Sequence, residues 1–222
     1  QVSGDIARAR GDIAHWLGVK PSELVFTAGG TEANNLAIQG VMRQFPQSNL
    51  VVSKVEHEAV LVPANQYDVR SVAVKPDGLI DLDGLQVAID DQTVLVSVMY
   101  ANNEIGTVQP LRQISALLRT IRTKRQKNGN ALPLYFHTDA CQASAWLDLH
   151  AHRLGVDMMT INAGKIYGPK QCGALFIKTG ILLKPQILGG GQERGLRSGT
   201  ENVANIVGFA KALQLVQSRR HQ

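Results

Sequence analysis

The segment VDMMTINAGKIYGPK, residues 156 to 170, joins a short apolar run to a lysine and a glycine–proline turn. The apolar run at 156–161 has the length and composition of a buried strand. Lys165 stands where this strand runs into Gly168 and Pro169, residues that interrupt regular structure. The lysine is therefore either solvated at a turn or placed in a site at the end of the strand.

Short apolar runs of the same kind alternate with helical patterns along the whole chain. They predict strands at 23–27, 49–54, 69–74, 93–99, 133–139, 156–161 and 173–178. Apolar residues at helical spacing predict helices at 3–19, 32–45, 57–66, 82–89, 111–126 and 200–217. This alternation predicts an α/β fold in which a mostly parallel sheet is flanked by helices on both faces.

The composition is that of a globular protein, with 222 residues of which 44% are apolar and 18% are charged. We expect a single domain from this length. The chain contains no apolar run of about 18 residues, so no membrane partner is expected. The two cysteines, Cys141 and Cys172, lack CxxC spacing, which argues against a disulfide framework and fits a reducing, cytoplasmic location.

The net charge of +5 raises the question of a nucleic-acid partner. The densest basic group, residues 119–127, lies at the end of a predicted helix, where cations complement the helix dipole. We interpret this group as a solvated helix end, because the chain has neither zinc-finger spacing nor an RNA-binding aromatic motif. No nucleic-acid partner and no metal site are predicted.

Polar residues gather directly after the predicted strands. The segments are AGGTEANN (28–35), VEHEA (55–59), YANNEIG (100–106), HTDACQ (137–142) and NAGKIYG (162–168). Because ligands bind outside the carboxyl ends of the strands in such sheets, we expect these segments to line one pocket. The predicted lining residues are Thr31, His57, Asn103, Asp139, Gln142 and Lys165.

The AGGTE turn at 28–32 suits a phosphate group. Small residues let backbone N–H groups approach an anion, and a helix N-terminus adds partial positive charge. A simple glycine turn with Thr31 as the helix N-cap explains the same residues equally well. No GxxxxGK[ST] motif occurs, and GGGQERG at 189–195 lacks the last glycine of GxGxxG.

Asp139 and Lys165 together suit a pyridine cofactor that carries an aldehyde. A carboxylate at a strand end is costly unless a cation, such as a protonated pyridine nitrogen, meets it. A lysine amine can form a Schiff base with an aldehyde, and His57 offers a flat ring that can stack on a cofactor. Asn103 and Gln142 can donate hydrogen bonds to a phenolate oxygen.

Each of these residues alone has an ordinary explanation. Asp139 could cap a helix, and His57 could be a satisfied surface or core residue. Asn103 could belong to a turn, and Lys165 could be solvated. Their coincidence at successive strand exits favours the set of groups that pyridoxal 5'-phosphate carries, namely phosphate, pyridine, aldehyde and phenol.

Six longer motifs strengthen this interpretation. They are FTAGGTEANNLAIQG (26–40), VEHEAV (55–60), NNEIGTVQP (102–110), DACQ (139–142), KIYGPKQCGAL (165–175) and GGGQERGLRSGTENV (189–203). In content and order they resemble the motifs of the class V aminotransferases, and most closely those of the cysteine desulfurases of the NifS/IscS type. The resemblance implies the large domain of a type I PLP-dependent transferase.

The resemblance implies residue roles that agree with the chemistry above. Lys165 is expected as the catalytic lysine that bonds the cofactor, and His57 as the catalytic residue that stacks on its ring. The expected cofactor-binding residues are Gly30, Thr31, His57, Asn103, Asp139, Gln142, Asn162, Lys165 and Thr200. Thr200 is expected to reach the phosphate of a neighbouring subunit, which implies a homodimer.

Two positions near the lysine depart from the family pattern. Gly164 stands where the group often has a phosphate-binding histidine, and Asn162 stands where serine is common. The Asn162 side chain can still donate a hydrogen bond. We therefore expect a phosphate site that is intact but rewired.

Family members are nearly twice as long as this chain. We expect residues 1–222 to be the cofactor-binding large domain, without the N-terminal segment and without the C-terminal small domain that carries the sulfur-accepting cysteine. Cys141 and Cys172 match no such cysteine, and we interpret both as structural.

The resemblance implies a PLP-dependent cysteine desulfurase, which converts L-cysteine to alanine and a persulfide for iron–sulfur cluster or thiolated-product synthesis. A sulfur-acceptor or scaffold protein is implied as a partner. The alternatives are a selenocysteine lyase, another class V enzyme, or a catalytically incomplete partner subunit. The NNEIG and RSGTENV motifs favour the desulfurase.

Overall fold

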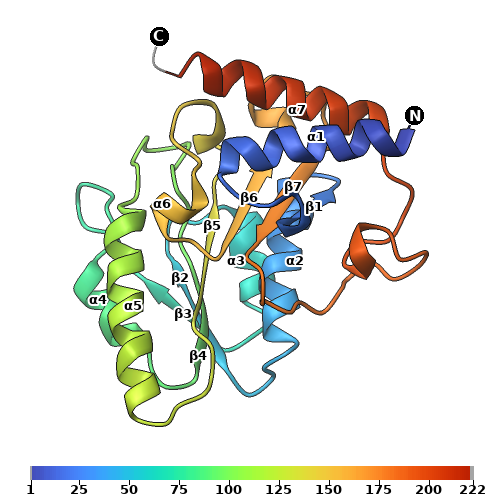
Figure 1. Ribbon diagram of the computed structural model, residues 1–222. Helices are drawn as coiled ribbons and strands as arrows, with labels where there is room; N and C mark the ends of the chain where they lie inside the picture. Colours follow the sequence, from blue (N-terminus) through green and yellow to red (C-terminus); the bar gives the residue numbers. More distant parts are fainter. Residues whose placement is uncertain (1, 221–222) are drawn as a thin grey trace.

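The computed structural model describes residues 2–220, and these contain one seven-stranded sheet (Figure 1). The strands are β1 (Leu24–Thr27), β2 (Asn49–Ser53), β3 (Val69–Val72), β4 (Thr93–Ser97), β5 (Tyr135–Asp139), β6 (Met158–Asn162) and β7 (Gly173–Ile177). Their spatial order is β1-β7-β6-β5-β4-β2-β3. Strand β7 runs antiparallel to both of its neighbours, and every other pair is parallel. The predicted mostly parallel sheet is confirmed.

Helices cover both faces of the sheet, as predicted. They are α1 (Val2–Leu17), α2 (Gly30–Met42), α3 (Glu58–Ala64), α4 (Leu82–Ala88), α5 (Leu111–Lys127), α6 (Ala151–Leu154) and α7 (Val203–Ser218). Helices α1 and α7 lie side by side over one face, whereas α2 and α3 pack on the other (Figure 1). The short helix α6 is not predicted, because one turn is too short to show a periodicity. No helix among residues 2–220 has both the length and the apolar character needed to cross a bilayer.

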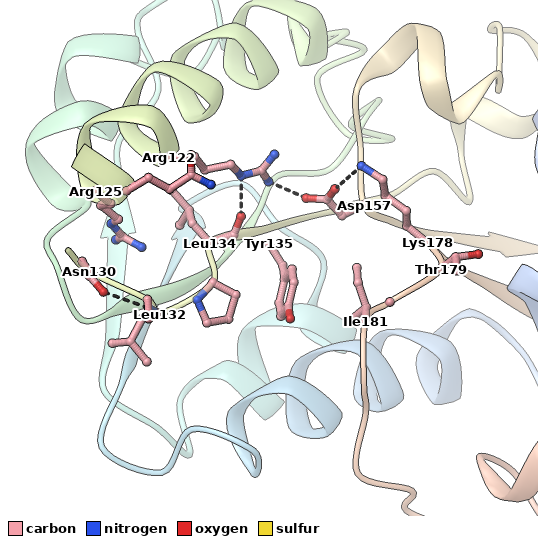
Figure 2. A pocket seen from close by; sticks show the side chains of 14 residues that line it. Arg122, Arg125, Asn130, Leu132, Leu134, Tyr135, Asp157, Lys178, Thr179 and Ile181 are labelled. Atoms are coloured by element: carbon pink, nitrogen blue, oxygen red, sulfur yellow. Dashed lines mark hydrogen bonds and ion pairs between the residues drawn. The ribbon is translucent and has the colours of Figure 1, made fainter. Parts of the chain in front are cut away.

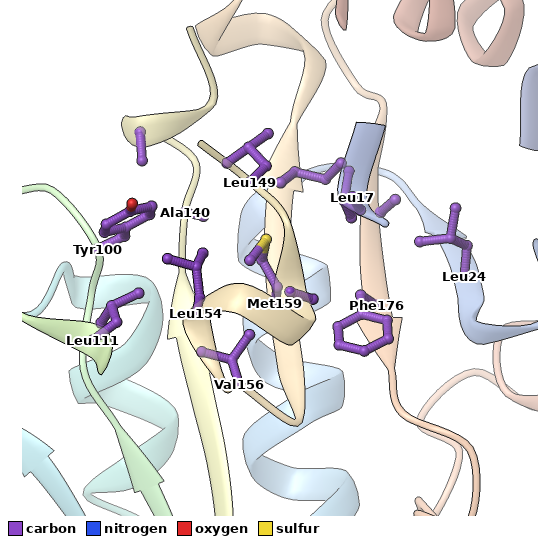
Figure 3. Packing of buried hydrophobic residues seen from close by; sticks show 14 of the residues in the cluster. Leu17, Leu24, Tyr100, Leu111, Ala140, Leu149, Leu154, Val156, Met159 and Phe176 are labelled. Carbon is purple, nitrogen blue, oxygen red and sulfur yellow. The ribbon is translucent and has the colours of Figure 1, made fainter. Parts of the chain in front are cut away.

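Two apolar cores, one on each face of the sheet, explain why the strands are continuous apolar runs. Leu24 and Phe26 of β1 pack into the core beneath α1 and α7, and Val25 between them packs into the core beneath α2. Figure 3 shows part of the first core, in which Met159 of β6 and Phe176 of β7 are completely buried. Burial stabilises a side chain of this size by about 1.5–3 kcal/mol. The strands that end at the site are therefore held by packing on both faces.

The carboxyl ends of β1 and of the parallel strands meet at one edge of the sheet. Thr27 and Asn162, which end β1 and β6, both pair with Gly173 at the start of β7. A Cβ atom at Gly173 would lie 2.7 Å from the carbonyl carbon of Gly29, so only glycine permits this approach. The register thus brings the turn at 28–32 beside the strand exit that leads to Lys165.

Candidate functional site

A cavity of about 230 Å³ opens at this edge of the sheet. All of the predicted site residues except Thr200 line it, namely Gly30, Thr31, His57, Asn103, Asp139, Gln142, Asn162 and Lys165. The cavity is also lined by Met99, which lies outside the predicted segments, and by residues of those segments that were not named individually, namely Asn34, Ala59, Ala101 and Cys141. The fold therefore brings the successive strand exits together around one cavity.

The N-terminus of α2 forms one wall of the cavity. Its N-cap is Gly29, so the alternative explanation of Thr31 as the N-cap is wrong. Because glycine offers no capping side chain, the N–H groups of the first turn remain available to a ligand. Gly30 lies against Cys141, and a Cβ atom there would come within 2.7 Å of the Cys141 Sγ. The glycine keeps the backbone open to the cavity.

The acidic residue of this first turn is already paired. Glu32 accepts a hydrogen bond from the backbone N–H of Ala28 at 2.9 Å and from the guanidinium of Arg197 at 2.8 Å. A carboxylate beside an anion site would repel the anion, and the Arg197 cation offsets its charge. Arg197 is a supporting residue that was not among the predicted site residues, although it lies within the quoted GGGQERGLRSGTENV motif.

The exit of β6 places Lys165 at the cavity. A 3₁₀ turn, η3 (Ala163–Lys165), follows the strand directly, and Asn162 caps it by accepting a hydrogen bond from the Gly164 N–H at 3.1 Å. The Asn162 amide nitrogen faces the start of α2. A Cβ atom built on Gly30 would lie 3.6 Å from this nitrogen. Lys165 is exposed, and its amine makes no hydrogen bond or ion pair to any other part of residues 2–220.

Asp139 ends β5 and is 7% exposed. Its Oδ2 accepts a hydrogen bond from the Asn34 amide at 2.7 Å, and its Oδ1 accepts one from the Cys141 N–H at 2.9 Å. These two donors fix the orientation of the carboxylate. The signal that could have identified Asn34 is its position on the buried face of an amphipathic helix, since a buried amide needs a partner.

His57 serves as the N-cap of α3 and lines the cavity at the same time. Its Nδ1 accepts a hydrogen bond from the Ala59 N–H at 3.0 Å, which places the ring proton on Nε2 and fixes the ring orientation. Asn103 is exposed and Gln142 is half-buried. Their amide side chains form no hydrogen bonds to other groups between residues 2 and 220, so both can donate to a ligand.

Both cysteines are unpaired and buried. Burial and the neighbouring Asp139 raise the pKa of the Cys141 thiol well above its usual range. Burial raises the pKa of Cys172 to about 12. The thiolate is the nucleophilic form of cysteine, and neither side chain forms it readily near neutral pH. This environment agrees with the interpretation of both cysteines as structural.

Thr200 does not join the other predicted residues. It is exposed and lies in a separate cavity of about 200 Å³, together with Ala28, Gln171 and Arg197. Its predicted contact is with the phosphate of a neighbouring subunit, so a position outside the cavity of its own chain is compatible with that role, which stays a prediction.

Two arginines of the basic group at 119–127 turn inward, so our interpretation of a solvated helix end is wrong for them. Arg125 is 4% exposed, and its guanidinium donates to the carbonyl of Thr93 at 2.8 Å. Arg122 pairs with Asp157 at 2.5 Å beside a cavity of about 450 Å³ (Figure 2). This cavity lies at the amino ends of β5 and β6, opposite the candidate site, and the arginines tie α5 to the sheet there.

The comparisons with known proteins agree with the geometry. The family described as Aminotransferase class-V matches residues 1–222. The cysteine desulfurase IscS of Dictyoglomus turgidum is 41% identical over 217 residues, which cover 95% of this chain and 52% of the relative. A solved NifS-like protein has a TM-score of 0.90 at 35% identity, and the match covers 99% of this chain and 60% of that chain. A structure described as SspA in complex with cysteine has a TM-score of 0.88 at 36% identity, covering 96% of this chain and 61% of that chain.

The chain spans about half the length of the curated relatives it matches. Within that span the family match includes every strand of the sheet and every residue of the candidate site. The fold is that of the NifS-like proteins. This chain belongs to the class-V aminotransferase family.

Proposed function

We propose that residues 1–222 form the cofactor-binding domain of a pyridoxal 5'-phosphate-dependent cysteine desulfurase. The observation that carries this proposal is the convergence of the Lys165 amine and the Asp139 carboxylate on one cavity. The amine suits an aldehyde, and the carboxylate suits a protonated pyridine nitrogen. Family membership supports the same cofactor, because class V aminotransferases are PLP enzymes.

The residues present fit the phosphate group of this cofactor. Gly30 forms a cradle that a Cβ atom would fill, and the first-turn N–H groups of α2 provide donors with partial positive charge. Thr31 and the Asn162 amide nitrogen would add side-chain donors to the same group. Backbone and amide donors would then take the place of the histidine that Gly164 does not supply, and the rewired phosphate site stays a prediction.

The residues present also fit the ring of the cofactor. His57 would stack on one face, with its imidazole held by the α3 cap. Asp139 would meet the ring nitrogen with its carboxylate already oriented by Asn34 and Cys141. Asn103 and Gln142 would donate to the phenolate oxygen.

When bound, the cofactor supplies an electron sink for the α-carbon of an amino-acid substrate. Lys165 would hold the aldehyde before the substrate enters. Its amine would also be the base that accepts the α-proton of the substrate. Both roles require an unpaired amine at the cavity, and Lys165 has no hydrogen bond or ion pair elsewhere in residues 2–220.

The substrate we propose is L-cysteine. Relatives named cysteine desulfurase and a similar structure described as SspA in complex with cysteine support this choice. The high thiol pKa values of Cys141 and Cys172 do not suit a nucleophile that takes up sulfur. We therefore propose that the sulfur-accepting cysteine belongs to a part of the protein outside residues 1–222.

The remaining partners follow from the same assignment. We propose a homodimer in which Thr200 of each subunit completes the phosphate site of the other. We also propose a sulfur-acceptor or scaffold protein for iron–sulfur cluster or thiolated-product synthesis. Two unpaired cysteines fit a reducing compartment, and we propose the cytoplasm.

An absorbance titration with pyridoxal 5'-phosphate tests the cofactor assignment. We expect a visible band in the wild-type chain, and reduction with borohydride should attach the cofactor to the peptide that contains Lys165. Lys165→Ala should abolish both results. Lys170→Ala, at an exposed lysine outside the cavity, is the matched control and should leave both unchanged. Labelling of another lysine with equal yield in Lys165→Ala would refute the assignment.

A further inference from the structure

The two loops that carry His57 and Asn103 are tied to each other by a pair of crossed hydrogen bonds. One loop follows β2 and the other follows β4, and these strands are parallel neighbours. The Met99 N–H donates to Glu56 Oε1 at 2.6 Å, and the Asn102 amide donates to the Val55 carbonyl at 2.9 Å. Each loop thus contributes one side chain that forms a hydrogen bond with the backbone of the other loop. We call Glu56 and Asn102 the exit brace.

Glu56 is buried to a degree unusual for a carboxylic acid, with 6% of its surface exposed. Its second oxygen, Oε2, is buried and has no hydrogen-bond partner among the described residues. Burial raises the pKa of this carboxyl well above its usual range, and the charge of Asp139 adds to the effect. Burial therefore favours the neutral form of this side chain, which avoids the desolvation cost of a buried charge, while Oε1 accepts the hydrogen bond from the Met99 N–H.

Asn102 shapes the loop in addition to bracing it. It is 9% exposed, and its Oδ1 accepts hydrogen bonds from the Glu104 N–H at 2.8 Å and the Ile105 N–H at 3.0 Å. The same side chain therefore closes the turn that contains Asn103 and anchors that turn to the β2 exit. Asn103, by contrast, lines the cavity.

The exit brace stands behind the cavity wall. Neither Glu56 nor Asn102 lines the cavity, whereas their neighbours His57, Met99 and Asn103 do. We propose that Glu56 and Asn102 are positioning residues that set the separation of His57 and Asn103 for the bound cofactor. This inference rests on the proposed function, because it assigns those two residues to the ring face and the phenolate oxygen.

The physical basis is preorganisation. His57 and Asn103 lie on exposed loops, and without the brace each loop would have to be ordered when the ligand binds. A displacement of about 1 Å at such contacts weakens them strongly. A brace made of buried hydrogen bonds fixes the spacing before binding, since water does not compete for buried donors.

Substitutions at both ends of the brace test the proposal through cofactor affinity. In Glu56→Gln, the side chain keeps its shape and its amide oxygen can still accept from the Met99 N–H, so we expect a dissociation constant within about threefold of wild type. In Glu56→Ala and in Asn102→Ala, we expect the dissociation constant for pyridoxal 5'-phosphate to rise about tenfold or more. The visible band of the bound cofactor should also shift in the two alanine variants, a signature that simple loss of stability would not cause.

Glu23 provides a matched control. It directly precedes β1, at the end of that strand opposite the cavity. It is also 6% exposed, and it binds the Thr179 N–H at 2.8 Å and the Thr179 hydroxyl at 2.7 Å. Glu23→Ala should lower the free energy of unfolding without changing cofactor affinity. The proposal is overturned if Glu56→Ala and Asn102→Ala bind the cofactor as tightly as Glu23→Ala does, or if Glu56→Gln is as weak as Glu56→Ala.

A measurement on the cofactor-free chain separates the brace from the proposed function. Hydrogen exchange of the Met99 amide should be slow in wild type and in Glu56→Gln, and fast in Glu56→Ala. If wild type binds no cofactor at Lys165, the proposed function fails. Exchange at Met99 that is equally fast in wild type and Glu56→Ala overturns the brace itself.

Discussion

Arg10 of α1 and Glu193 of the segment that follows β7 form a buried ion pair across the open edge of the sheet. The two contacts are 2.5 and 2.9 Å, and the side chains are 16% and 2% exposed. Arg10 also donates to the Leu24 carbonyl at 2.9 Å, and Glu193 accepts from the Phe26 N–H at 2.8 Å. Strand β1 is an edge strand, and this pair satisfies backbone groups that no neighbouring strand can reach. The same pair anchors the loop that leads to Thr200.

Breaking this pair should destabilise the protein markedly. Arg10→Met would leave the Glu193 carboxylate buried without its cation, and we expect a loss of about 3–5 kcal/mol in the free energy of unfolding by urea titration. Arg8→Ala removes a surface pair with Asp5, in which the arginine side chain is 73% exposed, and should cost less than about 1 kcal/mol. Equal losses in the two variants would contradict the structural role of the buried pair.

His137 should make stability depend on pH. It is completely buried between Ser97 and Thr160, at 2.8 and 3.0 Å, and burial lowers its pKa to about 4 from the ordinary 6.5. Well above pH 6.5, His137 is neutral in both the folded and the unfolded state, so it adds no pH dependence to the free energy of unfolding. As pH falls from 6.5 to about 4, the unfolded state gains the proton first, and stability falls by about 3 kcal/mol in total.

The contribution of His137 can be isolated by comparing variants. His137→Asn lacks the titrating group, so its free energy of unfolding should fall less steeply with acid than that of wild type. The difference in the free energy of unfolding between wild type and His137→Asn should narrow from pH 7 to pH 4. All other acid-sensitive groups are common to both proteins, so their contributions cancel in this difference. A constant difference over this range would mean that the buried imidazole does not titrate as expected.

Gly30 should tolerate no side chain while Cys141 is present. The Cβ atom of Gly30→Ala would lie 2.7 Å from the Cys141 Sγ, and we expect a loss of about 1–3 kcal/mol in stability together with weaker cofactor binding. Removal of the sulfur in the double variant Gly30→Ala/Cys141→Ala should restore much of the lost stability and much of the lost cofactor affinity. A double-mutant cycle with no coupling between the two sites would show that they are not in contact.

Gly164→His should tighten cofactor binding. A Cβ atom at this position would meet only the Asn162 Oδ1, at an ordinary 3.6 Å, so the backbone here accepts a side chain without a clash at Cβ. A new hydrogen bond to a charged phosphate should lower the dissociation constant by about tenfold. Gly164→Ala adds the Cβ alone and should leave affinity unchanged. If Gly164→His and Gly164→Ala gained the same affinity for the cofactor, the effect would come from the backbone and not from the imidazole.

The strand exits were predictable because they depend on local patterns. Apolar runs and helical spacing specify where each strand ends, and a parallel sheet must bring those ends to one edge. Asp139, Lys165 and His57 therefore could be assigned to one pocket from sequence. The contacts that support them could not: helical spacing places Asn34 on a buried face, but its bond to Asp139 and the bond of Glu56 to Met99 join distant parts of the chain.

Charge patterns were less informative than apolar patterns. The basic run at 119–127 predicts a solvated helix end, yet Arg125 is buried against the carbonyl of Thr93. A long side chain can reach either solvent or a distant backbone group, and the choice depends on the acceptors that the fold places within range.

The sequence by itself determined the alternation of strands and helices, the polar residues at each strand exit and the small residues that the turns require. These follow from periodicity and backbone sterics, which act over a few neighbouring residues. Only the tertiary structure decided that Asn34 orients Asp139, that Arg10 and Glu193 close the sheet edge, and that Glu56 and Asn102 join two loops. Such contacts join residues far apart in the chain, and their energies depend on burial and distances that arise only when the whole sheet has formed.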